Sequence, residues 1–263
     1  MGLMGAAMGL GMIVGPAIGG LLGHHGFALP FFVAGGLAIL TWPFALMILP
    51  ESLPKEQRAV KPTRQRISWN VLQDPLLVLF ALAFVITFAM AMFEATLALF
   101  AAAKINGFGT REMGILFAIL GVFGVIVQGG LIGRMSKRFG EKNLIVVGLL
   151  CSIAGMLLLL TASNIIMMTI MAVIFNTGVS IINPIASSLV SQNSSDGQGA
   201  ALGIMQSANS LGRIIGPIMG GILFDMQINF PYLAGAFILL LFMLVTANKL
   251  SRYMKTSPTP VES

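Results

Sequence analysis

The chain has 263 residues, of which 57% are hydrophobic and only 9% are charged. A soluble globular domain carries about 25% charged residues, so this composition excludes an ordinary soluble fold and indicates a membrane-embedded protein. The net charge is +6, but the basic residues fall between apolar runs, so we expect no nucleic-acid partner.

Eight apolar segments are long enough to cross the roughly 30 Å of bilayer hydrocarbon as helices. Because the runs are continuous and do not alternate, they predict an all-α membrane protein and not a β-barrel. The expected transmembrane spans are 2–23, 27–49, 75–101, 112–134, 143–162, 165–190, 200–224 and 229–249.

Basic residues lie mostly on one side of this eight-span arrangement. Twelve of the fifteen Lys and Arg residues fall in the 50–73 connection, around the 135–142 connection, or in the C-terminal tail. Positive loops face the cytoplasm. We therefore expect a multi-pass protein of the cell membrane (plasma or inner), with both termini in the cytoplasm.

The 50–73 segment is the only long polar connection, and it contains three prolines and no apolar periodicity. It predicts a cytoplasmic linker between two helical bundles. Residues 1–49 would be the last two helices of the first bundle. Residues 74–250 would form a complete six-helix second bundle, followed by a cytoplasmic tail over 251–263.

Two segments 201 residues apart resemble each other. Residues 9–22 and 210–223 are identical at eight of fourteen positions, including every glycine of a Gly-x-x-x-Gly-Pro-x-x-Gly-Gly core. Duplicated apolar helices interrupted by Gly and Pro are typical of secondary transporters. The offset implies that the chain holds spans five to twelve of a twelve-span protein and lacks the first four.

In each copy three glycines recur at intervals of four and share one helix face, where another helix can approach closely. A proline in register bends each helix. One copy alone would indicate ordinary helix packing, whereas two copies favour a hinge or gating surface. The predicted gating residues are Gly11, Gly15, Pro16, Gly19, Gly20, Gly212, Arg213, Gly216, Pro217, Gly220 and Gly221.

These residues carry a resemblance to a known family. Residues 11–20 resemble the antiporter motif in the fifth helix of major facilitator superfamily drug/proton antiporters, and residues 49–52 resemble the end of their sixth helix. The resemblance is closest to tetracycline and multidrug exporters. It implies a partial major facilitator fold with eight transmembrane helices, equivalent to helices five to twelve of twelve.

Residues 133–142 resemble the second copy of the superfamily's cytoplasmic loop motif. The motif positions are Gly133, Lys137, Arg138, Gly140 and Lys142. Lys137 stands where the family has Asp, and Glu141 stands where it has Arg, which argues against a charge lock built on that Asp. A gating role and a purely topological role for these basic residues are equally compatible with the sequence.

Two ionisable residues, Glu94 and Arg213, lie well inside expected spans. A charge at membrane depth usually faces a cavity or a partner. Glu94 is a candidate proton carrier or counter-ion for a cationic substrate. A static ion pair between the two residues and a position of Glu94 near the outer interface are the alternatives. For Arg213 a structural role is favoured, since it borders the Gly-Pro motif.

The resemblance also places Glu94, Asn176 and Asn183 near substrate, because the seventh and tenth helices line the family's central cavity. Phe93 precedes Glu94 and completes the predicted site. For the two asparagines, interhelical hydrogen bonds of about 0.6–2 kcal/mol each are an equally good explanation.

No nucleotide-binding loop, catalytic triad, zinc spacing or dinucleotide motif is present in the sequence, and the single cysteine gives no metal spacing. We therefore expect a non-enzyme without cofactor or metal, whose partners are the lipid bilayer, a small-molecule substrate and protons. The leading hypothesis is proton-coupled efflux of lipophilic or cationic drugs by alternating access. The alternatives are a sugar or other metabolite transporter and a truncated membrane protein that does not transport.

Overall fold

The computed structural model describes residues 28–48, 74–194 and 198–253, together with positions 11, 15, 18, 19, 22, 23 and 26. Helices account for nearly all of these residues, and no strand occurs among them. The helices are α2 (Ala28–Ile48), α4 (Asp74–Lys104), α5 (Thr110–Ile126), the π-helix η2 (Val127–Leu131), α6 (Ile132–Phe139), α7 (Glu141–Leu159), α8 (Ile165–Asn193), α9 (Gln198–Met226) and α10 (Phe230–Tyr253).

Seven of the eight expected spans coincide with these helices, and the span over 2–23 lies largely outside the described residues. Within the described residues, five helical segments are long and apolar enough to cross a membrane: Ala28–Ile48, Leu76–Lys104, Thr110–Gly129, Glu141–Leu159 and Ile165–Asn193. Phe230–Thr246 is a shorter apolar segment. At 29 residues α9 is also long enough, but its glycines and polar residues make it less apolar.

The expected connection over 135–142 is the main difference in secondary structure. The helix that begins at Thr110 continues through the π-helical turn η2 into α6, which ends only at Phe139. Gly140, with a φ of 77°, makes the whole turn before α7 begins. A single residue suffices because glycine adopts this left-handed conformation without strain.

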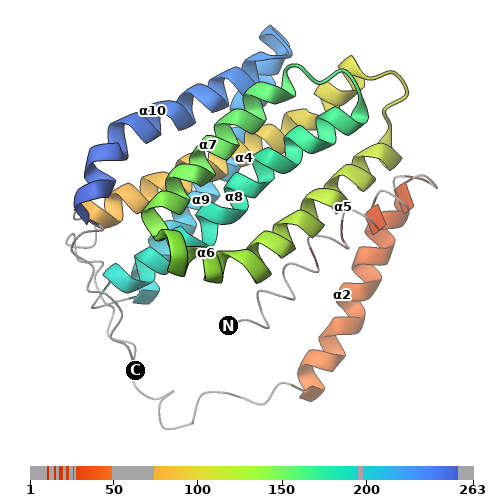
Figure 1. Ribbon diagram of the computed structural model, residues 1–263. Coiled ribbons are helices and arrows are strands. Elements are labelled where there is room, and N and C mark those ends of the chain that lie inside the picture. The colour runs from red at the N-terminus through yellow and green to blue at the C-terminus, as the bar shows by residue number, and fades with distance from the viewer. Residues whose placement is uncertain are drawn as a thin grey trace.

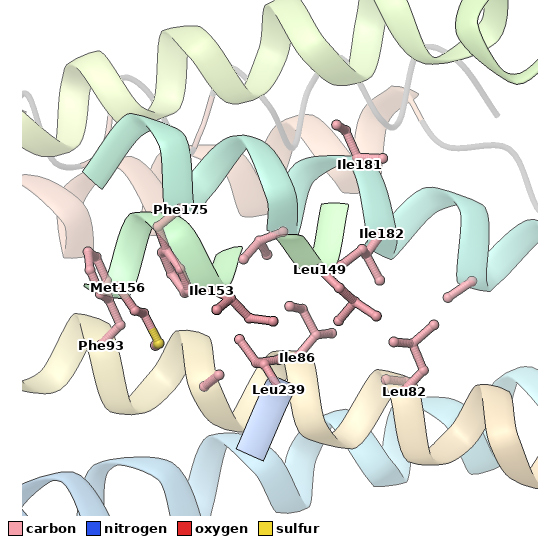
Figure 2. Packing of buried hydrophobic residues seen from close by; sticks show 14 of the residues in the cluster. Leu82, Ile86, Phe93, Leu149, Ile153, Met156, Phe175, Ile181, Ile182 and Leu239 are labelled. Carbon is pink, nitrogen blue, oxygen red and sulfur yellow. The ribbon is translucent and has the colours of Figure 1, made fainter. Parts of the chain in front are cut away.

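Helices α4, α7, α8, α9 and α10 pack side by side into one bundle, with α5 along its edge (Figure 1). Figure 2 shows the core of this bundle, where apolar side chains from α4, α7, α8 and α10 meet. Leu82 and Ile86 of α4 and Leu149 of α7 are almost fully enclosed there. The core therefore lies within the segment that the sequence assigns to a second bundle.

Small residues bring α7 and α8 into backbone contact. A Cβ atom added at Gly178 would overlap the Gly148 carbonyl oxygen and Ser152, and one added at Gly155 would overlap the backbone of Phe175. Close approach through small residues is a common way to join helices in lipid, where the hydrophobic effect does not drive them together. This contact fixes α8 against the core.

Helix α2 has no buried side chain. It stands apart from the bundle (Figure 1). Its large hydrophobic side chains are exposed, for example Phe31 at 77% and Trp42 at 68%. A membrane helix with such a surface needs lipid or other helices around it. The separation is compatible with the predicted domain division at residues 50–73, which stays a prediction.

Candidate functional site

The glycine face of α9 lies directly on the backbone of α4. A Cβ atom added at Gly216 would lie only 2.7 Å from the Phe88 carbonyl oxygen, and one at Gly212 would lie 2.8 Å from the Phe88 amide nitrogen. Gly220 lies mainly against side chains, because its Cβ would be 2.9 Å from Cγ of Met92 and 3.3 Å from the Met92 carbonyl oxygen. The close helix approach that the spacing of four predicts is therefore present, and its partner is α4.

The other predicted gating residues are placed differently. Pro217 lies inside α9 and is exposed, and Gly221 has open space where a Cβ would stand. In the first copy a Cβ at Gly11, Gly15 or Gly19 would meet nothing within 4 Å, while Pro16 and Gly20 lie outside the described residues. A gating role for both copies stays a prediction.

The glycine contacts also fix the relative direction of the two helices. Successive glycines of α9 meet successive turns of α4 in ascending order. The nearest α4 residues are Phe84, Thr87 and Phe88 at Gly212, then Phe88, Ala91 and Met92 at Gly216, then Met92 and Thr96 at Gly220. The helices are therefore parallel, as expected for two odd-numbered spans of one protein.

One flank of this interface is polar. Thr87 Oγ1 of α4 and Asn209 Oδ1 of α9 form a hydrogen bond of 3.0 Å. Glu94 lies two turns beyond Thr87 on the same face of α4, and Arg213 lies one turn beyond Asn209 on α9. We call these four residues, Thr87, Glu94, Asn209 and Arg213, the polar seam.

Glu94 and Arg213 lie on the same flank of the interface, about two turns apart. The glycine contacts set the register of the two helices. Gly220 packs between Met92 and Thr96, level with Glu94, so Arg213 lies about seven residues, or roughly 10 Å, lower along the polar seam. Both side chains are exposed, and their charges interact without a direct ion pair. The static ion pair weighed as an alternative is not formed in this conformation.

Phe93 lies on a different face from Glu94. Its ring is 2% exposed and stacks on Phe175, with ring centroids 4.3 Å apart. Figure 2 shows Phe93, Phe175 and Met156 pointing toward one another in the core. Consecutive helical residues point about 100° apart, so adjacency to Glu94 in sequence does not give a shared surface. Phe93 packs the core here, and its predicted contact with substrate stays a prediction.

An aromatic cluster continues from Phe93 toward the end of α4. Tyr232 of α10 meets Phe93 and Phe100 edge-on, at centroid distances of 6.0 and 4.7 Å. The Thr96 hydroxyl lies 3.2 Å from the Tyr232 hydroxyl. Lys104 lies over the Phe100 ring and donates to the Leu160 carbonyl at the end of α7. The cluster ties α4 to α7, α8 and α10.

Replacing Phe93 with alanine is expected to destabilise the protein by about 3 kcal/mol or more, because a buried phenylalanine leaves a cavity. Thermal unfolding of the purified protein in detergent would measure this. Phe237→Ala is the matched control, since Phe237 of α10 is 63% exposed and should cost far less. Equal stability losses in the two variants would contradict the core position of Phe93.

The two asparagines on α8 differ in their contacts. Asn176 Nδ2 donates to the Leu120 carbonyl of α5 at 2.8 Å, so it forms the interhelical hydrogen bond considered for it. Asn183 is half-buried, and the described residues provide its side chain with no hydrogen bond. Neither asparagine is hydrogen-bonded to Glu94. Substrate contacts by Asn176 and Asn183 stay predictions.

The loop motif forms the end of α6 and the turn into α7. Arg138 lies 5.5 Å from the centroid of the Phe139 ring, and Asn143 Nδ2 donates to the Phe139 carbonyl at 2.9 Å. Gly140 supplies the positive φ of the turn, while Gly133 and Lys142 flank it on the two helices. These contacts build a compact turn, and a gating role stays a prediction.

Sequence reasoning did not include Thr87 or Asn209 in the site. The signal was present, because Thr87 stands seven residues before Glu94 and Asn209 four before Arg213. Helical spacing puts each pair on one face. Only the observed pairing of α4 with α9 brings the two faces together.

Comparison with known proteins identifies the family. A profile described as Major Facilitator Superfamily matches residues 1–195 and 129–262, which together cover nearly the whole chain. Similar proteins include two from Bacillus subtilis (strain 168). Multidrug resistance protein 2 is 29% identical over 250 residues, which are 91% of this chain and 61% of that protein. Multidrug resistance protein 1 is 31% identical over 235 residues, with 88% and 59% covered.

Quinolone resistance protein NorA of Staphylococcus aureus (strain COL) is 28% identical over 236 residues, which are 88% of this chain and 59% of NorA. The chain thus spans about three fifths of the length of these relatives. The family match and the apolar helices together indicate a multi-pass membrane protein with a partial major facilitator fold. The chain belongs to the major facilitator superfamily.

Proposed function

We propose that this chain is part of a transporter that exports lipophilic or cationic small molecules in exchange for protons. The observation that carries the proposal is Glu94, a carboxyl group within a long apolar helix that is exposed on the polar seam and has no direct ion-pair partner among the described residues. The names of the relatives, multidrug and quinolone resistance proteins, support drugs as the exported molecules.

The carboxyl group of Glu94, placed within the apolar helix α4, suits proton exchange. A charge inside a membrane costs several kcal/mol unless it is paired or hydrated, so Glu94 gains by binding either a proton or a cation. A cationic substrate and a proton would compete for it, and this competition couples their opposite movements. The charge of Arg213 is near enough to influence the binding of a proton or a cation at Glu94, but Arg213 forms no direct ion pair with the Glu94 carboxylate.

The proposed mechanism is alternating access. Two bundles rock around a site near the middle of the membrane, and each facing state binds the substrate with a different affinity. The tight contact between α4 and α9 would make this part of the second bundle move as one body. Most basic residues fall in connections on the same side of the membrane as the two termini. This supports cytoplasmic termini and a location in the plasma or inner cell membrane.

The test is dye extrusion from bacterial cells that lack their own exporters and express this protein. Cells preloaded with a fluorescent lipophilic cation are expected to lose it faster than cells with empty vector, and a protonophore should remove the difference. Extrusion that survives the protonophore would contradict proton coupling. Stimulated sugar uptake without dye extrusion would instead support a metabolite transporter, and no transport of either kind would support a non-transporting protein.

A further inference from the structure

We propose that Arg213 is the anion-binding half of a two-charge substrate site, so that the polar seam accepts amphiphiles carrying both an amine and a carboxylate. This inference rests on the proposed function, in which Glu94 receives the cationic group. It assigns Arg213 a contact with substrate, whereas its sequence context favoured a structural role.

The packing of α9 determines where Arg213 points. Gly212 and Gly216 lie against the backbone of α4, so the helix cannot rotate about this contact without a clash. Arg213 follows Gly212 by one residue, about 100° around the helix, and therefore emerges beside the interface. The Thr87–Asn209 hydrogen bond lies on the same flank, one turn earlier.

Arg213 has no ion-pair partner among the described residues. Its side chain is exposed, and none of the described residues forms an ion pair or a ring contact with it. A guanidinium group at membrane depth is costly unless it faces water or an anion. Its planar fork binds a carboxylate through two parallel hydrogen bonds, which a lysine ammonium cannot reproduce.

Glu94 supplies the opposite charge at a distance suited to one ligand. It lies roughly 10 Å higher along the polar seam, by the helix rise, and the two side chains do not touch. Two opposite charges that are separated in this way and do not pair with each other can each bind one end of an elongated ligand, with the amine at Glu94 and the carboxylate at Arg213. A ligand with a single positive charge would use Glu94 alone.

A shallow, open hollow lies on α9 next to the Arg213 end of the polar seam, on the turns that precede Arg213. The four seam residues do not line it, so it offers room only for a part of the ligand that extends past Arg213. The lining residues of the hollow are Gly203, Gln206, Ser207, Ser210, Leu211 and Ile214. The hollow combines small and polar groups with two apolar side chains.

The experiment uses two dyes that differ only in the carboxyl group. A rhodamine with a free carboxyl group is a zwitterion at neutral pH, and its ethyl ester is a monocation. Binding of each dye to the purified protein in lipid nanodiscs is measured by fluorescence anisotropy. We expect the wild type to bind both dyes, and Arg213→Gln to weaken binding of the free acid about tenfold while leaving the ester within about twofold.

Two further variants separate recognition from folding. Arg213→Lys retains the charge but not the fork, so it should recover part of the acid binding that Arg213→Gln loses. Glu94→Gln should weaken both dyes, because both carry the cationic xanthene. Unchanged ester binding by Arg213→Gln shows at the same time that this variant is folded.

The outcomes distinguish this inference from the proposed function. Equal weakening of both dyes by Arg213→Gln, no effect on the acid, or a wild type that binds the ester but not the acid would overturn the role of Arg213 and leave drug export standing. Undiminished binding of both dyes by Glu94→Gln would overturn the two-charge site. A wild type that binds neither dye would overturn both proposals.

Discussion

Replacing Glu94 with glutamine is expected to abolish proton-driven export while leaving the helical bundle folded. Glutamine has nearly the same shape as glutamate but cannot release or accept a proton at neutral pH. Because Glu94 is exposed on the polar seam and makes no direct ion pair there, the substitution leaves no buried charge without a partner. Its effect should therefore fall on transport and not on stability.

The measurement is dye transport in proteoliposomes with an imposed proton gradient. Transport by Glu94→Gln should fall to the level of protein-free liposomes, while the thermal unfolding midpoint stays close to that of the wild type. Asp225→Asn is the matched control, because Asp225 is an exposed carboxylate near the end of the neighbouring helix α9. Wild-type transport by Glu94→Gln would exclude a coupling role for this residue.

Replacing Gly216 with alanine is expected to push α4 and α9 apart and destabilise the protein, whereas replacing Gly221 with alanine is expected not to lower its stability. The new methyl group at Gly216 would stand 2.7 Å from the Phe88 carbonyl oxygen and 3.0 Å from the Met92 amide nitrogen. Both are backbone atoms, so one helix must move. Overpacking of this kind costs about 1–3 kcal/mol, and it would also disturb the register of the polar seam.

Gly221 is the matched control in the same helix. A Cβ atom there meets nothing within 4 Å, so alanine adds helix propensity of up to about 1 kcal/mol without a clash. Thermal unfolding followed by circular dichroism in detergent should show a lower midpoint for Gly216→Ala and an unchanged or higher one for Gly221→Ala. Similar shifts in both variants would mean that α4 and α9 do not pack as the structure shows.

The helical fold is largely predictable from the sequence, because a bilayer makes every backbone polar group find its partner within its own segment. Continuous apolar runs thus become helices almost wherever they occur. The turn around Gly140 was expected to be longer because its residues are polar and basic. In the structure α6 continues to Phe139, since only one glycine with a positive φ is needed to reverse the chain.

The candidate site is less predictable, and Phe93 shows why. Sequence adjacency suggested that it shares a surface with Glu94, whereas the structure stacks its ring on Phe175 in the core. Asn176 likewise was a candidate for substrate contact and in the structure bonds to the Leu120 carbonyl of α5. In both cases the deciding contact comes from a residue more than fifty positions away, which local spacing does not identify.

The sequence by itself determined that lipid surrounds the protein and that the chain forms helices. It also revealed the duplicated Gly-Pro motif and the two charges at membrane depth. Each of these depends on composition or on the period of a single helix. Only the tertiary structure decided that Gly212, Gly216 and Gly220 lie on α4. That packing makes α4 and α9 parallel and sets their register, and the Thr87–Asn209 bond lies on one flank of it. A helix's period says which residues share a face, but the neighbour that covers the face is chosen by packing across the whole bundle. Glu94 and Arg213 are therefore two isolated charges in the sequence, whereas in the folded protein both belong to the polar seam.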